Sequence, residues 1–144
     1  MREFLIRQFF DDIKHLNYVV QRNWDNLPKD YALPGHNDLD LFSTDEDKPK
    51  IQEILKKYEE IYCDVRSPED DYYPYELFMM LLQNRVEKDG FFIPNTMAAF
   101  FALYYHNLIH KKDDPYNYKL RMLFKEMFPP VKCKDEGVGY YDFN

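Results

Sequence analysis

Glycine and cysteine are scarce in this 144-residue sequence, which has four glycines and two cysteines. Cys63 and Cys133 are too few for a disulfide scaffold and lack the paired spacing of a zinc site, which favours a reducing compartment. With few glycines and 45% hydrophobic residues, the composition is neither disordered nor fibrous. The length suits one folded domain.

An excess of basic residues and a long apolar run are also missing. The chain has 26 acidic and 19 basic residues, and its net charge of -7 argues against long nucleic acid as a partner. The apolar stretch at residues 97–105 is far short of a membrane span, and the first residues lack the features of a signal peptide. We therefore expect a soluble, cytoplasmic protein that binds no membrane, while oligomerisation is left open.

Aromatic residues are abundant instead, with 13 tyrosines and 12 phenylalanines. Packing in the core is the expected use of most of them. The pairs Tyr72-Tyr73 and Tyr104-Tyr105 have the alternative of stacking on a sugar or a nucleobase, but their helical spacing favours burial.

Hydrophobic periodicity predicts an α/β (α+β) fold: a small mixed β-sheet flanked by helices, with a helical C-terminal half that closes a cleft. The predicted elements are a helix at 3–16, a strand at 17–23, a strand at 38–42, a helix at 51–61, a strand at 61–66, a helix at 75–86, an extended connection at 90–94, a helix at 96–111 and a helix at 116–128. We treat 1–144 as one domain, with a catalytic-type sheet and helices at 1–74, a helical part at 75–128 and an irregular tail at 129–144.

The segment Asn37-Asp38-Leu39-Asp40-Leu41-Phe42 carries the strongest functional signal. Alternation along a strand places Asp38 and Asp40 on one face, close enough to share a hard cation. Magnesium takes one or two carboxylates plus substrate phosphates, so such a pair calls for a nucleotide. Asp64, on the following strand, is the candidate third ligand or the base that takes a proton from an attacking hydroxyl.

The order of these motifs resembles the nucleotidyltransferase superfamily over roughly residues 17–66. In that family the pattern is hG[GS], a spacer, Dh[DE]h and a later h[DE]h, where h is hydrophobic. Asp38-Leu39-Asp40-Leu41 matches the second motif, and Cys63-Asp64-Val65 matches the third. The resemblance implies a magnesium-dependent transfer of a nucleotidyl group from a nucleoside triphosphate to a small hydroxyl or phosphate acceptor, such as a sugar.

The chain departs from this family at the first motif, where Gln21-Arg22-Asn23 replaces the glycine pair that holds the triphosphate. Arg22 and Asn23 would then bind phosphate through their side chains, and Arg66 is a third candidate on the same strand face as Asp64. The chain also resembles uncharacterised nucleotidyltransferase-like proteins linked to surface-polysaccharide synthesis. The shared segments are Arg22-Asn23, Asp38-Leu39-Asp40, Asp64-Val65-Arg66 and Tyr105-His106-Asn107-Leu108-Ile109-His110-Lys111.

Other interpretations remain open at this point. An Asp-x-Asp pair also holds the metal of a nucleotide sugar in glycosyltransferases, although the 37 residues before it are few for the long parallel sheet of that fold. The missing glycine pair favours a non-catalytic binding or regulatory module, and exposed acidic pairs are often mere surface charge. His106 and His110 share a helix face, but Asn107 stands where a metalloprotease has glutamate, so packing is favoured over zinc binding, with a contact to substrate as the alternative.

Overall fold

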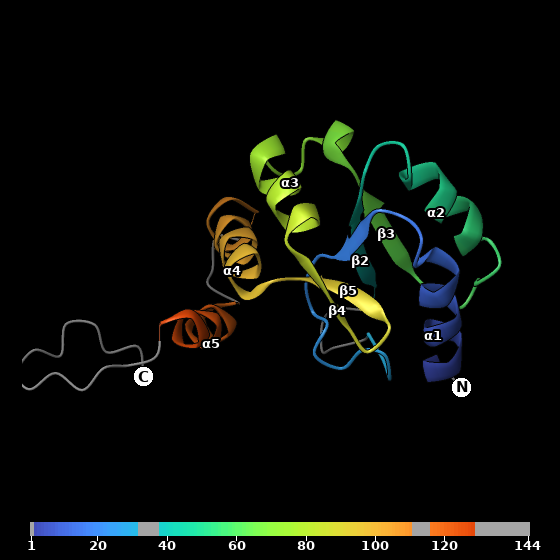
Figure 1. Ribbon diagram of the computed structural model, residues 1–144, viewed down its shortest axis with the longest axis horizontal. Helices are drawn as coiled ribbons and strands as arrows, with labels where there is room; N and C mark the ends of the chain where they lie inside the picture. Colours follow the sequence, from blue (N-terminus) through green and yellow to red (C-terminus); the bar gives the residue numbers. More distant parts are fainter. Residues whose placement is uncertain (1, 32–37, 111–115, 129–144) are drawn as a thin grey trace, which may run out of the picture. The chain divides into compact units, whose positions relative to one another are not determined.

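The computed structural model describes residues 2–31, 38–110 and 116–128 and has a mixed α+β fold (Figure 1). Contacts divide the chain into two compact units, Met1–Asn95 and Thr96–Asn144. The predicted division of the chain after residue 74 stays a prediction. The elements of the first unit are α1 (Arg2–Ile13), β1 (Tyr18–Val20), β2 (Leu39–Ser43), α2 (Lys48–Leu55), β3 (Cys63–Arg66), η1 (Pro68–Asp70), α3 (Tyr75–Gln83), β4 (Arg85–Lys88) and β5 (Phe91–Pro94).

The first unit is built on a three-stranded mixed sheet in the order β1-β2-β3. β1 runs antiparallel to β2, whereas β2 runs parallel to β3. A parallel pair needs a crossover connection, and α2 supplies it between β2 and β3. Figure 1 shows α1 and α2 on one side of these strands and α3 on the other. The predicted small mixed sheet with flanking helices is confirmed.

Aromatic side chains fill the core of this unit, as the composition predicts. α1 buries Ile6, Phe9, Phe10 and Ile13, whose spacing of three and four residues places them on one face. Phe10 reaches Phe91 of β5 with ring centroids 5.2 Å apart. On the opposite side, Phe42 of β2 stacks on Phe78 of α3 at 4.6 Å. Tyr73 is also buried, which confirms the expected core role for that side chain.

The strand β2 is buried along its whole length. The predicted alternation places the leucines on one face of the strand and the aspartates on the other. Helices cover both faces of this central strand, so Asp40 is only 3% exposed. Asp38 immediately precedes β2, and β1 is likewise shorter than predicted, so that Gln21, Arg22 and Asn23 follow its end.

A β-hairpin formed by β4 and β5 is the main element that the sequence patterns missed. The helix predicted at 75–86 ends at Gln83, and Val86 lies in β4 rather than in a helix. Within the segment 90–94, Phe91–Pro94 form β5, which pairs antiparallel with β4, rather than an extended connection. Asp89 and Gly90 form the turn with φ values of 51° and 91°. Two such residues in sequence are the signature of a tight hairpin turn, so the Asp-Gly pair carried the missed signal.

Arg85 ties this hairpin to the three-stranded sheet. Its Nη1 donates to the carbonyl oxygens of Leu16, at 3.2 Å, and Tyr18, at 2.8 Å. The guanidinium also lies over the ring of Phe92, 4.1 Å from the centroid. The side chain thus satisfies backbone acceptors next to β1 and packs on β5 at the same time.

The second unit, taken by itself, is helical. It contains α4 (Thr96–Tyr105), η2 (His106–His110) and α5 (Asn117–Met127). The helix predicted to run to residue 111 changes after Tyr105 into a single π-helical turn. α4 and α5 pack together through Phe100 and Phe124, whose ring centroids are 5.9 Å apart. The expectation that helices close a cleft over the sheet stays a prediction.

Several other predicted boundaries shift by a few residues. α1 ends at Ile13 rather than residue 16, and α2 spans Lys48–Leu55, so Tyr58 and Ile61 lie beyond its end. Asn37 at the start of the Asp38–Asp40 segment, Lys111 at the end of the helix predicted at 96–111 and the tail at 129–144 fall outside the described residues. Cys133 lies outside them as well.

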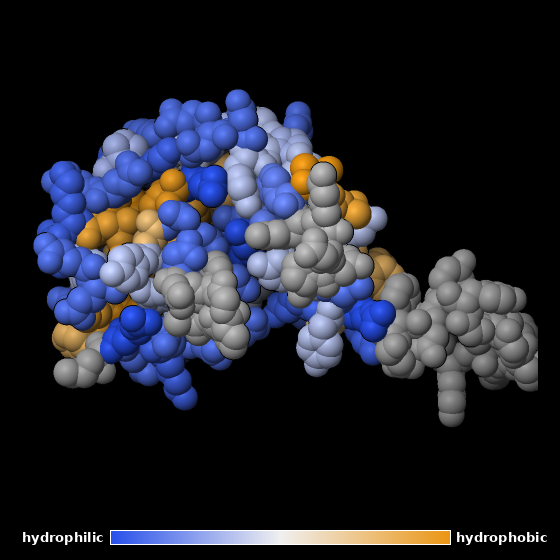
Figure 2. All heavy atoms as spheres, turned by 180° about the vertical axis from the view of Figure 1, so that it is seen from behind, coloured by the Kyte–Doolittle hydropathy of each residue, from blue (hydrophilic) through white to orange (hydrophobic). Residues whose placement is uncertain are grey.

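Polar side chains cover most of the face shown in Figure 2, with smaller hydrophobic areas between them. Across residues 2–31, 38–110 and 116–128, none of the helices combines the length and the apolar character that crossing a membrane requires.

The buried carboxylate of Asp47 fastens the start of β1 to the start of α2. It accepts hydrogen bonds from the backbone N–H of Asn17 at 2.8 Å and from Asn17 Nδ2 at 3.1 Å. We expect Asp47→Ala to lower the free energy of unfolding by about 1–3 kcal/mol, because it removes two hydrogen bonds that a buried carboxylate accepts from Asn17. Urea denaturation at pH 7 measures the loss. Glu46→Ala is the matched control, since Glu46 is exposed and should change stability by less than about 0.5 kcal/mol.

The same contact predicts a pH dependence. Burial alone would raise the pKa of Asp47, but the Asn17 hydrogen bonds and the Lys50 ion pair outweigh it and hold the pKa below the ordinary value of 3.8. The stabilisation is therefore complete above pH 3.8 and is lost as the pH falls through the lower pKa of the folded state. The difference between the wild type and Asp47→Ala should shrink as the pH falls below that value. A difference that stays constant into strong acid would contradict this assignment.

Candidate metal centre

Three aspartates meet where the parallel strands β2 and β3 run side by side. The strand register pairs Asp40 with Asp64. Residues directly opposite each other in a sheet project their side chains to the same face. Asp38 is two residues before Asp40 and therefore falls on that face as well. The β2–β3 register and the two-residue period of a strand therefore bring the three side chains together, as predicted.

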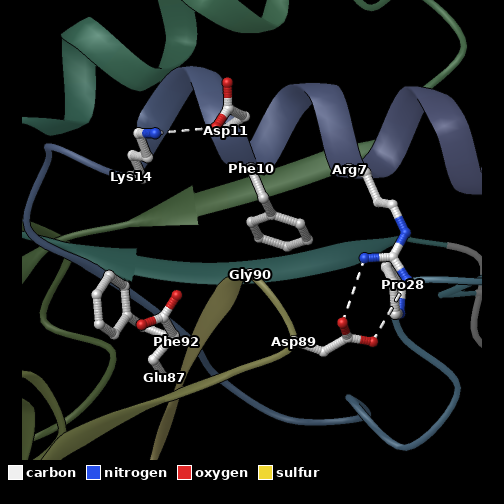
Figure 3. A pocket seen from close by; sticks show the side chains of 9 residues that line it. All are labelled: Arg7, Phe10, Asp11, Lys14, Pro28, Glu87, Asp89, Gly90 and Phe92. Atoms are coloured by element: carbon white, nitrogen blue, oxygen red, sulfur yellow. Dashed lines mark hydrogen bonds and ion pairs between the residues drawn. The ribbon is translucent and has the colours of Figure 1, made fainter.

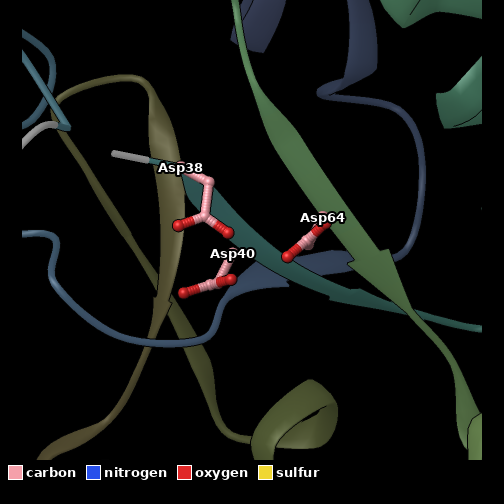
Figure 4. Close-up of side chains that lie close together, drawn as sticks. All are labelled: Asp38, Asp40 and Asp64. Carbon is pink, nitrogen blue, oxygen red and sulfur yellow. The ribbon is translucent and has the colours of Figure 1, made fainter. Parts of the chain in front are cut away.

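One carboxylate oxygen from each of the three aspartates lies within 4.8 Å of the other two. Figure 4 shows the carboxylate of Asp64 pointing from β3 toward those of Asp38 and Asp40. The burial is graded, since Asp40 is buried, Asp38 is half-buried and Asp64 is exposed. The cluster is thus anchored in the sheet and open to solvent on the side of Asp64. Carboxylate oxygens at this spacing are the ligands that hard divalent cations prefer.

The proximity of the carboxylates shifts the pKa of Asp64. A hydrogen bond with Asp38, followed by burial and the negative charge of Asp38, raises the pKa of Asp64. The charges of Arg66 and Arg22 oppose that rise. Burial raises the pKa of the neighbouring Cys63 thiol, and all three carboxylates add to the effect. Cys63 is therefore a poor nucleophile.

Arg22 lies next to the most buried of the three aspartates. Its Nη2 is 3.6 Å from Oδ2 of Asp40, and the arginine side chain is only 14% exposed. The neighbouring residue, Gln21, donates its backbone N–H to the carbonyl oxygen of Asp40 at 2.8 Å. The end of β1 is therefore fixed alongside β2, which delivers the guanidinium to the carboxylate. The sequence patterns predict Arg22 as a phosphate ligand, but they do not predict this ion pair.

Asn23 adopts a left-handed backbone conformation with φ of 62°. Glycine favours this conformation, and asparagine tolerates it better than most other residues. The turn that follows β1 therefore forms without the glycine pair of the nucleotidyltransferase motif. The binding of phosphate by Asn23 stays a prediction.

Arg66 lies on the same strand as Asp64, and its guanidinium is 4.0 Å from the centroid of the Tyr72 ring. Tyr72 in turn contacts Phe42 and Tyr73, with ring centroids 6.2 Å and 5.1 Å away. An aromatic surface thus positions the second arginine near the carboxylates. Tyr73 also contributes a hydroxyl, which accepts a hydrogen bond from Gln21 Nε2 at 3.4 Å. The sequence did not single out Gln21, and its position after a short strand carries no distinctive signal.

The histidines of the second unit contact each other. Nδ1 of His106 lies 3.1 Å from Nδ1 of His110, and His106 is buried. The ring of Tyr116 packs against His106 at 5.4 Å. The expectation that His106 is packed is therefore confirmed. A contact of either histidine with substrate stays a prediction.

A cavity of about 380 Å³ lies between α1 and the β4–β5 hairpin, away from the three aspartates (Figure 3). Four of its five charged side chains form ion pairs with one another, because Arg7 contacts Asp89 at 3.3 Å and Lys14 contacts Asp11 at 3.1 Å. The aspartate cluster, whose like charges face one another, is the stronger candidate for chemistry.

Comparison of the sequence with models of protein families, with curated proteins and with solved structures finds no match. The geometry of the aspartates and the resemblance of their motifs therefore carry the functional argument.

Repulsion within the cluster predicts that removal of one charge stabilises the metal-free protein. Asp64→Asn keeps a hydrogen-bonding group beside Asp38 while it removes a like charge, so the free energy of unfolding in EDTA should rise, by at most about 1 kcal/mol at this exposed position. Urea denaturation of the two proteins measures the change. Glu59→Gln, which removes an exposed charge elsewhere, is the control and should have little effect. A less stable Asp64→Asn protein would show that the three carboxylates do not repel one another.

Proposed function

We propose that this chain is a magnesium-dependent nucleotidyltransferase that moves a nucleotidyl group from a nucleoside triphosphate to a small hydroxyl or phosphate acceptor, such as a sugar. The observation that supports the proposal is the approach of Asp38, Asp40 and Asp64 to within 4.8 Å on adjacent strands. The two-residue spacing on one strand is enough to place Asp38 and Asp40 together. The third carboxylate, Asp64, comes from a different strand, and its presence in the cluster therefore favours a shared role.

The donor set fits magnesium. All three side chains offer hard oxygen ligands, and magnesium commonly takes one or two carboxylates together with waters and substrate phosphates. The exposed side of the cluster, at Asp64, leaves room for those additional ligands. When bound, the ion would neutralise the charge that develops on the phosphates and align the attacking and leaving oxygens.

The residues of the chain have separable roles in this proposal. Asp38 and Asp40 hold the ion, and Asp64 either holds it or takes the proton of the acceptor hydroxyl as that oxygen bonds to the α-phosphorus. The bond from that phosphorus to the bridging oxygen then breaks, and pyrophosphate leaves. Arg22, Asn23 and Arg66 are the proposed phosphate ligands, and both guanidinium groups act on Asp64 through their charge.

The two alternative functions have less support. A glycosyltransferase needs a long parallel sheet ahead of its Asp-x-Asp motif, whereas the described strands that contain Asp40 form a sheet with one parallel pair. A binding or regulatory module would leave Asp64 free to face away from Asp38 and Asp40, and it faces toward them (Figure 4). A cytoplasmic location and a part in surface-polysaccharide synthesis stay proposals that rest on composition and resemblance.

Isothermal titration calorimetry tests the proposal directly. Magnesium, with and without a hydrolysis-resistant analogue of each nucleoside triphosphate, is titrated into the metal-free protein. Asp38→Asn and Asp40→Asn should each weaken magnesium binding by about tenfold or more, because substitution of residues one shell farther from a metal already costs that much. Asp11→Asn, at an exposed position on α1, should bind as the wild type does. Unchanged magnesium binding in both cluster variants would refute the proposed metal site.

A further inference from the structure

Asp40 is a buried carboxylate whose negative charge is offset by a nearby arginine, Arg22. Its carboxylate is 3% exposed, and a carboxylate withdrawn from water requires a nearby positive charge or strong hydrogen bonds. Arg22 supplies such a charge, but the Nη2 to Oδ2 distance of 3.6 Å exceeds the length of a normal hydrogen bond. The contact is therefore an electrostatic pair without the tight geometry of a fork-shaped arginine–carboxylate bridge.

A divalent cation held by Asp40 competes with this pair. It would compensate the same carboxylate with twice the charge, and it would place that charge close to the guanidinium, which carries the same sign. Both effects weaken the hold of Asp40 on Arg22. Repulsion between the cation and Arg22 is relieved only if the guanidinium moves away or gains an anionic partner of its own.

We propose that Arg22 is a counter-ion of Asp40 that a divalent cation displaces, and that the released guanidinium then binds a phosphate group of the incoming ligand. This proposal rests on the proposed function of the aspartate cluster and adds an order of events to it. Cation and phosphate binding become mutually cooperative, because the cation frees the arginine that the phosphate needs. Coupling of this kind is reciprocal, so phosphate must strengthen cation binding by the same factor.

The charges around the cluster support this order. Without a cation, three carboxylates outweigh the guanidiniums of Arg22 and Arg66 by one negative charge, which disfavours a phosphate. One divalent cation reverses the sign of that balance. Two further donors are close in sequence to these arginines and aspartates, because Nδ2 of Asn23 and Nε of Arg66 are buried with no acceptor among the described residues.

Calorimetry with an arginine variant tests the displacement. Magnesium is titrated into metal-free wild type, Arg22→Gln and Arg66→Gln. Removal of the competing guanidinium should tighten magnesium binding in Arg22→Gln by about fivefold or more, the lower end of typical coupling between ligands. Arg66→Gln is the matched control, because it removes an equal charge from a side chain that packs on Tyr72, and its effect should be smaller. If both variants change the magnesium affinity equally, Arg22 acts only through its overall charge and does not compete for Asp40, which would overturn the proposal.

The same titrations in the presence of inorganic phosphate test the second half of the proposal. Phosphate should tighten magnesium binding to the wild type and should tighten it several-fold less in Arg22→Gln, which keeps only Asn23 and Arg66 as proposed phosphate ligands. Equal coupling in both proteins would show that Arg22 does not receive the phosphate. Asp38→Asn and Asp40→Asn separate this outcome from failure of the metal site. If either weakens magnesium binding while Arg22→Gln behaves as the wild type, only the displacement is refuted; if magnesium binds both aspartate variants normally, the proposed function falls as well.

A measurement on the wild-type protein tests the displacement without any substitution, so its result does not depend on whether a variant folds. With ¹⁵N-labelled arginine, exchange of the Arg22 Nη–H protons with solvent should become several-fold faster at saturating magnesium, because Nη2 of the guanidinium leaves Asp40. Arg85 is the internal reference, since backbone carbonyls hold it away from the cluster, and its exchange should not change. Exchange at Arg22 that is as slow with magnesium as without it would refute the displacement.

Discussion

The parallel pairing of β2 with β3 is the constraint on which the candidate site depends. Its register sets Asp40 opposite Asp64, and a slip of one residue would send the two carboxylates to opposite faces of the sheet. The buried apolar residues of β2 resist such a slip because they would have to change faces and lose their packing partners, as Phe42 would lose its contact with Phe78. Core packing and the placement of the carboxylates are therefore enforced by the same hydrogen bonds between strands.

Three carboxylates, those of Asp38, Asp40 and Asp64, repel one another on this face of the sheet. Like charges that face one another reduce stability, and folded proteins retain such arrangements mainly where a ligand will neutralise them. Two positive charges offset part of this repulsion. Arg22 pairs with Asp40, and Arg66, which packs on Tyr72, lies close enough to act on Asp64 through its charge. An aspartate cluster with built-in counter-ions can fold without a bound cation and is suited to the magnesium site that we propose.

Much of the site was predictable from the sequence because it depends on local rules. The two-residue period of a strand places Asp38 and Asp40 together, and the order of elements brings Asp64 to the adjacent strand. The burial of Asp40 was not predictable, because it depends on which helices cover the strand. The hairpin was missed for another reason: Arg85 to Lys88 is mostly charged and follows a helix directly, so only the Asp89-Gly90 turn signalled it. The Arg22–Asp40 pair joins two strands across a loop, and no local pattern encodes it.

The position of β3 in the order β1-β2-β3 has a consequence for the behaviour of the protein in solution. Among the described strands, β3 has a neighbour on one side only, so its other edge presents backbone groups that another chain can add to. Asp64 and Arg66 occupy this edge strand, and charged side chains there discourage pairing with a second chain. The residues proposed to handle the nucleotide thus also protect the folded protein from aggregation through its sheet.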